Sequence, residues 1–288
     1  MTTGQPTWAA LEADWADRVR ANREQVDRLR EVPDGTDFYA PVSGLFRADP
    51  GRTDEPVLDA LRSLVVRGET WLDIGAGAGR YALPIAQIAG EVIAIDPSNG
   101  MLATLRELMT QFGIGDVRPI QGRWPPSPDL ADALGPFPCA DVALIAHVGY
   151  DIGEIGPFVE AMEAAARRLC VAMLMERQPA SVADPFWPPV HGEARISLPA
   201  LPEFVELLFA RGRASDMTTF ERDPRRFDGR AELVAFLRRQ LWIADRGDKE
   251  RRFRATLDEL IVDEDGRVGL TTQQPVTIGL VTWLPPGR

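Results

Sequence analysis

Residues 71–80 read Trp71-Leu72-Asp73-Ile74-Gly75-Ala76-Gly77-Ala78-Gly79-Arg80, and this stretch decides the fold. Three glycines alternate with alanines, and Asp73 lies two positions before the first glycine. The spacing predicts a buried strand that ends in a tight turn where a helix begins, because glycine reaches backbone angles that other residues adopt only at a cost. Glycine also lets a ligand approach the main chain closely.

A second acid, Asp96, ends the apolar run 92–95, 21 residues after Gly75. An acidic side chain at this offset, at the end of a second strand, is typical of ribose recognition. The loop departs from the dinucleotide fingerprint G-x-G-x-x-G, because Arg80 occupies the place of its third glycine. The pattern present is D-x-G-x-G-x-G. The chain here resembles the class I S-adenosylmethionine (SAM)-dependent methyltransferases, whose first motif has this form.

Apolar runs alternate with segments of helical periodicity, which predicts an open parallel sheet wound by helices. The expected strands are 70–75, 91–95, 117–121, 141–146, 169–175 and 275–284, with a proline-rich loop up to residue 138. The expected helices are 7–31, 54–66, 79–89, 98–112, 155–167, 201–211, 229–244 and 248–262. With the resemblance, this implies a Rossmann-like, doubly wound α/β fold. Its seven-stranded sheet is mostly parallel with an antiparallel last strand, and it carries N-terminal and C-terminal helical additions.

We expect a methyltransferase domain at 55–288, with its core at 68–176 and substrate-side additions at 177–262. A helical segment and lid at 1–54 precedes it. The chain has 288 residues and a net charge of −11, which disfavours nucleic acid and anionic membranes as partners. The only cysteines, Cys139 and Cys170, lie in or beside apolar runs and are expected as buried thiols, with no metal site. Without a signal segment or membrane span, a cytoplasmic protein is expected, and a homodimer is one option.

The resemblance implies that SAM binds at the glycine loop. Backbone groups of the loop would approach the cofactor, Asp73 would accept from its ammonium, and Asp96 would accept from the ribose hydroxyls. The alternative role of Asp96 is to cap the following helix. The full set of expected cofactor-binding residues is Asp73, Gly75, Ala76, Gly77, Arg80, Asp96, Pro97, Met101, Gly122, Arg123, Trp124, Ala146 and His147.

Three members of that set have a structural alternative or depart from the family pattern. Arg123 stands where many members of the family have an acid that contacts adenine, so only main-chain contacts from Arg123 and Trp124 are expected there. Core packing is the equal alternative for Trp124. Met101 either lines the adenine or packs on a helix face.

His147 and Tyr150 follow the expected strand 141–146, and ligands of parallel sheets lie beyond the carboxyl ends of the strands. Both are candidate catalytic residues, with His147 as general base because imidazole titrates near neutral pH. The alternative for His147 is to close the strand end or pack on the cofactor. Candidate substrate-binding residues are Tyr39, Phe46, Tyr150, Trp187 and His191, for which loop packing is the alternative.

Arginines recur at 222, 225, 226 and 230, which indicates a solvated face, with an acidic-substrate site as the alternative. The resulting hypothesis is methyl transfer from SAM to a small-molecule acceptor. One rival is a non-catalytic SAM-binding protein. Another is an NAD(P)-dependent oxidoreductase, which Arg80 and the absence of a Tyr-x-x-x-Lys pair disfavour.

Overall fold

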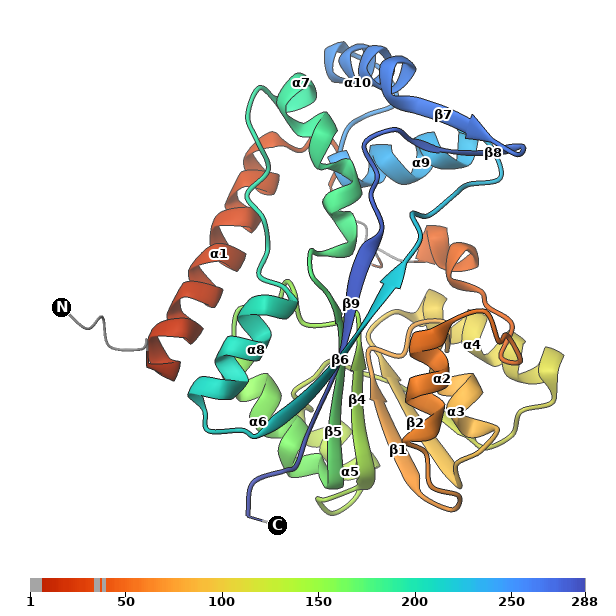
Figure 1. The fold of residues 1–288 in the computed structure, drawn as a ribbon, viewed down its shortest axis with the longest axis vertical. Coiled ribbons are helices and arrows are strands. Elements are labelled where there is room, and N and C mark those ends of the chain that lie inside the picture. Colours follow the sequence, from red (N-terminus) through yellow and green to blue (C-terminus); the bar gives the residue numbers. More distant parts are fainter. Residues whose placement is uncertain (1–6, 34–36, 38–39, 288) are drawn as a thin grey trace.

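A seven-stranded sheet forms the centre of the molecule (Figure 1). The structure is a computed structural model that describes residues 7–33, 37 and 40–287. The strand order is β3-β2-β1-β4-β5-β9-β6. The strand bounds are β1 Thr70–Ile74, β2 Glu91–Asp96, β3 Val117–Gln121, β4 Ala140–Ala146, β5 Ala166–Met175, β6 Ser215–Arg222 and β9 Val276–Trp283.

Strand direction brings most carboxyl ends to one edge of the sheet. Strands β1 to β5 pair in parallel, and β9 is antiparallel to both of its neighbours, β5 and β6. Strand β6 therefore points the same way as β4 and β5, and its last residue, Arg222, lies at the edge where those strands end. The expected fold class, with its antiparallel last strand, is confirmed.

Helices cover both faces of the sheet (Figure 1). The first face carries α1 Trp8–Leu29, α5 Pro128–Leu134, α6 Ile155–Ala165 and α8 Leu201–Ala210. Their apolar side chains, such as Trp15, Phe158 and Phe204, share one core cluster with the strands. The second face carries α2 Pro56–Ser63, α3 Ala82–Ala86 and α4 Asn99–Phe112. It encloses a second cluster that includes Leu58, Tyr81 and Leu102. The strands are buried on both sides, which explains their nearly continuous apolar runs.

A smaller unit, the cap, stands above the carboxyl edge of the sheet (Figure 1, top). The cap consists of η2 Pro179–Phe186, α7 Trp187–His191, α9 Arg230–Leu241, α10 Asp248–Leu260 and the hairpin of β7 Ile261–Glu264 and β8 Arg267–Leu270. It has its own core, in which Phe186, Trp187, Leu237 and Phe253 are fully buried. Most of the cap is inserted in the chain between β6 and β9, which are neighbouring strands of the sheet.

The N-terminal helix is fixed by buried polar contacts. Asn22 donates to the Ile196 carbonyl, and the Gln25 amide donates to the Ala194 carbonyl at 2.8 Å and accepts from Ile196 N at 2.7 Å. Trp15 Nε1 donates to the Ile152 carbonyl at 2.8 Å. Helix α1 is thus hydrogen-bonded both to the turn before α6 and to the irregular segment before α8. The division of the chain at residue 54 stays a prediction.

Two sequence expectations need correction. The segment expected as a proline-rich loop contains α5, because the Ser127 side chain caps it by accepting from Leu130 N and Pro128 occupies its first position. Strand β6 falls in a segment for which no strand was expected. It is an edge strand with mostly exposed side chains, so its sequence lacks a buried alternating pattern.

Candidate functional site

The turn after β1 is built from three glycines with positive φ, which are 76° at Gly75, 56° at Gly77 and 83° at Gly79. A Cβ at Gly75 would lie 2.5 Å from a methyl of Val148, and one at Gly79 would lie 2.4 Å from a methyl of Leu105. A Cβ at Gly77 would have nothing nearer than the Met101 sulfur at 4.0 Å. Two glycines therefore permit close packing, whereas Gly77 borders space that a ligand can approach.

Asp96 ends β2 and fastens this turn. Its Oδ2 accepts from Gly77 N, and its Oδ1 accepts from Ser98 N, both at 2.8 Å. Burial raises the pKa of Asp96; the two backbone donors act against this, and nearby Asp37 adds to it. Ser98 caps α4 through its side chain. Ser98, and not Asp96, is therefore the N-cap residue of α4. The lone pairs that remain on the Asp96 carboxylate can accept hydrogen bonds from ribose hydroxyls.

Asp37, which lies in the segment before α2, contacts the start of α4 next to Asp96. Its carboxylate accepts from Ser98 Oγ at 2.7 Å and from Gly100 N at 3.1 Å. Helix η1, Ala40–Phe46, then packs on α4, where Gly100 leaves room for Ala40. Phe46 lies at the end of η1 and is half-buried. Tyr39 falls outside the described residues.

Asp73 is a buried acid without a counter-ion among the described residues. Asp73 belongs to strand β1 and is 2% exposed. Its Oδ1 has no hydrogen-bond partner among the described residues. Burial raises its pKa to about 7, and the negative charge of Asp96 contributes. A cationic group of a ligand would stabilise this carboxylate. This orphaned oxygen is the observation that best fits the ammonium of SAM.

A second polar cluster centres on Glu55 at the start of α2. Its Oε2 accepts from Arg52 Nε at 2.7 Å and from Arg80 at 2.8 Å, and its Oε1 accepts from Tyr81 OH at 2.9 Å. Burial works to raise the pKa of Glu55, but Arg80 and Arg52 outweigh it and the net shift is downward. Burial raises the pKa of Tyr81 to about 12, so its phenol stays protonated. Arg80 thus pairs with Glu55, and its contact with a cofactor stays a prediction.

His147 follows β4 in a strained conformation, with φ of 59°. Its backbone N donates to the Met173 carbonyl at 2.8 Å. Both ring nitrogens are buried and have no partner within the part of the chain that the structure describes. Burial lowers its pKa to about 3, helped by the positive charges of Arg222 and Arg80. The imidazole is therefore neutral at physiological pH, with a free lone pair.

Tyr81 lies close to the ring of this histidine, whereas Tyr150 contacts the neighbouring strand β5. The Tyr81 and His147 rings lie 6.2 Å apart. Tyr150 OH accepts from Met175 N at 2.7 Å, and burial raises the pKa of its phenol. Tyr150 therefore holds the end of β5, and a catalytic or substrate-binding role for it stays a prediction. Sequence reasoning missed Glu55 and Tyr81. The only signal for Tyr81 is its place directly after the loop and Arg80.

The remaining expected cofactor residues lie around the ends of β2, β3 and β4. Met101 is buried against the loop, and Pro97 is exposed. Gly122 N donates to the Asp96 carbonyl at 3.1 Å, and Arg123 is exposed. Ala146 is half-buried at the end of β4 and packs on the second core cluster. Trp124 lies in the first core cluster, where its Nε1 donates to the Phe158 carbonyl at 3.2 Å.

Two expected substrate residues, Trp187 and His191, lie inside the cap. Their rings are 4.6 Å apart, and His191 Nε2 is 3.0 Å from the Leu241 carbonyl. Trp187 is fully buried, and the Arg195 guanidinium stacks on it at 5.2 Å. These contacts build the cap core, and binding of a substrate by either residue stays a prediction.

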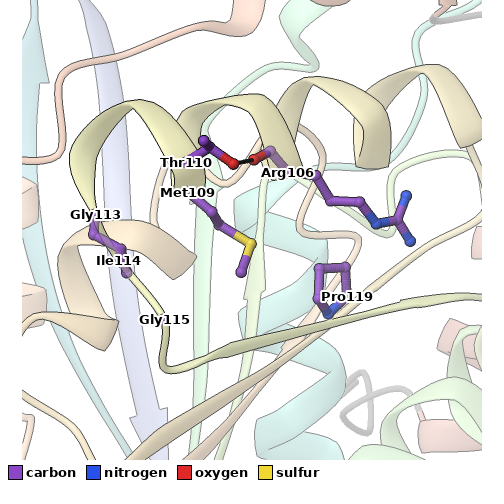
Figure 2. Close-up of a pocket in the computed structure, with 7 residues that line it drawn as sticks. All are labelled: Arg106, Met109, Thr110, Gly113, Ile114, Gly115 and Pro119. Atoms are coloured by element: carbon purple, nitrogen blue, oxygen red, sulfur yellow. Dashed lines mark hydrogen bonds between the residues drawn. The ribbon is translucent and has the colours of Figure 1, made fainter.

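A surface hollow lies away from these clusters. It has a volume of about 540 Å³ and is lined by Arg106, Met109 and Pro119 with the turn 113–115 (Figure 2). This turn joins the end of α4 to the start of β3, which is the amino edge of the sheet, opposite to His147. Across residues 7–33, 37 and 40–287, no group of three or more His, Cys, Asp or Glu side chains is arranged to hold a metal. No helix in the same ranges is long and apolar enough to cross a membrane.

Comparison with known proteins agrees with this geometry. Residues 72–148 match a family model described as a methyltransferase domain. This segment of the chain is therefore similar to methyltransferase domains. The matched segment runs from β1 to the residue after His147, so it includes the glycine loop, Asp96 and the end of β4.

An uncharacterized protein of Haemophilus influenzae is 31% identical over 119 residues, which is 41% of this chain and 41% of that protein. The chain thus matches about two fifths of the length of that relative. The YcgJ protein of Bacillus subtilis has a TM-score of 0.54 at 16% identity and covers 80% of this chain and 98% of its own. The magnesium protoporphyrin IX methyltransferase ChlM of Synechocystis, solved with bound SAH, has a TM-score of 0.50 at 12% identity, covering 85% and 96%. At these identities the two structures share the fold of this chain. Methyltransferases of this family use SAM.

Proposed function

We propose that this chain is a SAM-dependent methyltransferase that acts on a small molecule. The observation that carries the proposal is the buried pair Asp73 and Asp96 beside a glycine turn, with one Asp73 oxygen unpaired among the described residues. SAM would supply a methyl group on a cationic sulfur, which is a strong electrophile. The domain match and the fold support this reading over an oxidoreductase.

In this proposal the chain's own residues divide into three roles. Asp73 faces the cofactor's ammonium, Asp96 accepts from the ribose hydroxyls, and backbone groups around Gly77 line the cofactor. His147 lies at the end of β4, where its neutral ring can accept a proton from the acceptor. The Glu55 cluster holds Tyr81 against the His147 ring and fixes the start of α3. Alignment of the acceptor with the methyl group contributes much of the rate in such a reaction.

Calorimetry tests the proposal directly. Wild-type protein is expected to bind SAM and S-adenosylhomocysteine, and not NADH. Failure to bind either adenosyl compound at high protein concentration would sink the proposal. Transfer of labelled methyl from SAM into a metabolite extract then separates an enzyme from a protein that only binds SAM.

The raised pKa of Asp73 predicts pH-dependent SAM binding. A cationic ligand stabilises the ionised carboxylate, so below the pKa of about 7 binding must first remove a proton. We expect the dissociation constant to rise up to about tenfold per pH unit as pH falls from 7 to 5. Titrations in two buffers of different ionisation enthalpy should show release of protons near pH 6. Measurements stay below pH 7.5, because α-amino groups lose their charge above that range.

The matched variant Asp73→Asn keeps the size of the side chain and removes its titration. Its SAM affinity should be weaker than that of wild type at pH 7 and nearly independent of pH. An equally steep pH dependence in Asp73→Asn would assign the effect to another group.

The neutral state of His147 predicts a flat rate profile and a loss of rate in a variant. With SAM saturating, kcat should show no inflection near 6.5, the usual histidine pKa, because burial lowers the pKa of His147 to about 3. We expect His147→Asn to lower kcat by about a hundredfold, since asparagine tolerates positive φ but is no base. SAM affinity should change less than threefold. A kcat close to wild type in His147→Asn would exclude the imidazole as the proton acceptor.

A further inference from the structure

Two arginines at and just after the end of β6 form no ion pair with an acid in the part of the chain that the structure describes. Among described residues, the side chains of Arg222 and Arg225 form no hydrogen bond or ion pair, although both residues are half-buried. Their neighbours in sequence are paired with acids of the cap, Arg226 with Glu264 and Arg230 with Asp258. The four arginines therefore differ: two pair with acids at the surface of the cap, and two have no acidic side chain in ion-pair contact among the described residues. Half-buried guanidiniums without a partner are unusual, because desolvated charges are normally paired.

Strand direction places Arg222 at the carboxyl edge, on the face of the sheet that holds Tyr81. Phe220 and Val276 pack against the second core cluster, which includes Tyr81. Arg222 lies two residues after Phe220 and pairs with Val276, so it belongs to the same face. Burial is the largest cause of the lowered pKa of His147, and the positive charge of the Arg222 guanidinium is the next.

Arg225 continues this positive region toward the cap. Its guanidinium lies 4.9 Å from the Phe227 ring centre and 5.2 Å from that of Phe236. Burial lowers its pKa, and the charges of Arg222 and Arg80 add to the shift while Glu232 opposes it. The two rings hold the guanidinium in place without neutralising it. Glu232 acts on Arg225 without forming an ion pair with it, so among the described residues the guanidinium remains available to an anionic ligand.

Acidic and basic side chains gather in different parts of the site. Burial raises the pKa of both Asp73 and Asp96, with Asp96 contributing to the first shift and Asp37 to the second. The charged groups that act on the buried His147 ring are Arg222, Arg80 and Glu55, and Arg80 pairs with Glu55. Glu55 is already occupied by Arg52, Arg80 and Tyr81. A protein with a net charge of −11 therefore concentrates positive charge beside the proposed methyl site.

We propose that Arg222 and Arg225 bind an oxyanion, a carboxylate or a phosphate, carried by the methyl acceptor. Guanidinium groups match the planar or tetrahedral oxygens of these anions through paired N–H donors. The statement that the methyl acceptor carries this anion rests on the proposed function. The anion site itself does not depend on it. The anion would satisfy both arginines and orient the acceptor between the cap and His147.

Anion titrations test the site without any knowledge of the acceptor. Sodium phosphate and sodium acetate are titrated into wild-type protein by calorimetry, with sodium chloride keeping the ionic strength constant. At least one anion should bind, and the comparison tells phosphate from carboxylate chemistry. Arg222→Gln and Arg225→Gln should each weaken that binding by at least about tenfold. The control Arg230→Gln, which loses only the pair with Asp258 on the cap surface, should bind like wild type.

The results separate this inference from the proposed function. SAM affinity should stay within threefold of wild type in both variants, because the arginines lie on the acceptor side. If neither anion binds wild type, or if both variants bind it unchanged, the inference is overturned even where SAM binds normally. Should Arg225→Gln fail to fold because its ring contacts are lost, Arg222→Gln on the edge strand decides the question alone. Labelled methyl product should be retained on an anion exchanger, and label found only in the unretained fraction contradicts an anionic acceptor.

Discussion

Asp96→Ala is expected to raise the dissociation constant for SAM by about a hundredfold or more. In the proposed site its carboxylate accepts from two ribose hydroxyls, and each charge-assisted hydrogen bond is worth about 1.5–3 kcal/mol. The same carboxylate also holds Gly77 N and Ser98 N, so its loss loosens the loop that lines the cofactor. Calorimetry with SAM measures the affinity, and a thermal melt by circular dichroism checks that the fold remains.

The matched control is Asp116→Ala. Asp116 is an exposed acid just before β3, at the amino edge of the sheet, so its removal changes net charge by the same amount. Its SAM affinity should equal that of wild type. An Asp96→Ala protein that is folded and binds SAM within threefold of wild type contradicts the ribose assignment.

Gly79→Ala is expected to destabilise the folded protein by about 2–4 kcal/mol. The φ of 83° disfavours any side chain, and the new Cβ would lie 2.4 Å from Leu105 and 3.0 Å from Leu83. Both leucines are buried in the second core cluster, so neither can move away without opening that core. Chemical denaturation monitored by circular dichroism measures the free energy of unfolding.

Gly77→Ala is the matched comparison in the same loop. Its φ of 56° makes alanine strained by about 1 kcal/mol, but the nearest atom to the new Cβ is 4.0 Å away. We expect a small loss of stability and a larger loss of SAM affinity, because this Cβ would enter the space next to the cofactor. Equal destabilisation by the two variants would show that the loop glycines have one shared role.

Local sequence signals predicted the parts of the fold whose cause is local. Glycines 75 to 79 specify a turn through their backbone freedom, and the apolar runs of β1, β2 and β4 specify buried strands. Strand β6 gave no such signal, because an exposed edge strand need not alternate. Helix α5 was hidden by its prolines, although Ser127 and Pro128 form an ordinary helix start.

Side chains outside the glycine loop were harder to interpret, because their roles depend on distant partners. Trp187 and Trp124 are aromatic residues near expected loops, and the structure buries both in core clusters. Glu55 is held by hydrogen bonds from three side chains at positions 52, 80 and 81. No sequence periodicity connects these positions to residue 55. Arg222 and Arg230 look alike in sequence, yet the latter has an acidic partner in the cap and the former has none among described residues.

The sequence by itself determined six of the seven strands of the sheet, the glycine turn and the two acids at the ends of β1 and β2. These features depend on backbone angles and on hydrophobic periodicity, which act over a few neighbouring residues. Only the tertiary structure decided that Asp73 is left without a partner among the described residues and that His147 is neutral. It also decided that Arg222 lies at the same edge of the sheet as His147, and that Arg225 packs on two rings of the cap. Burial and pairing of charges depend on segments far apart in the chain, and those are brought together only when the cap and the sheet are folded.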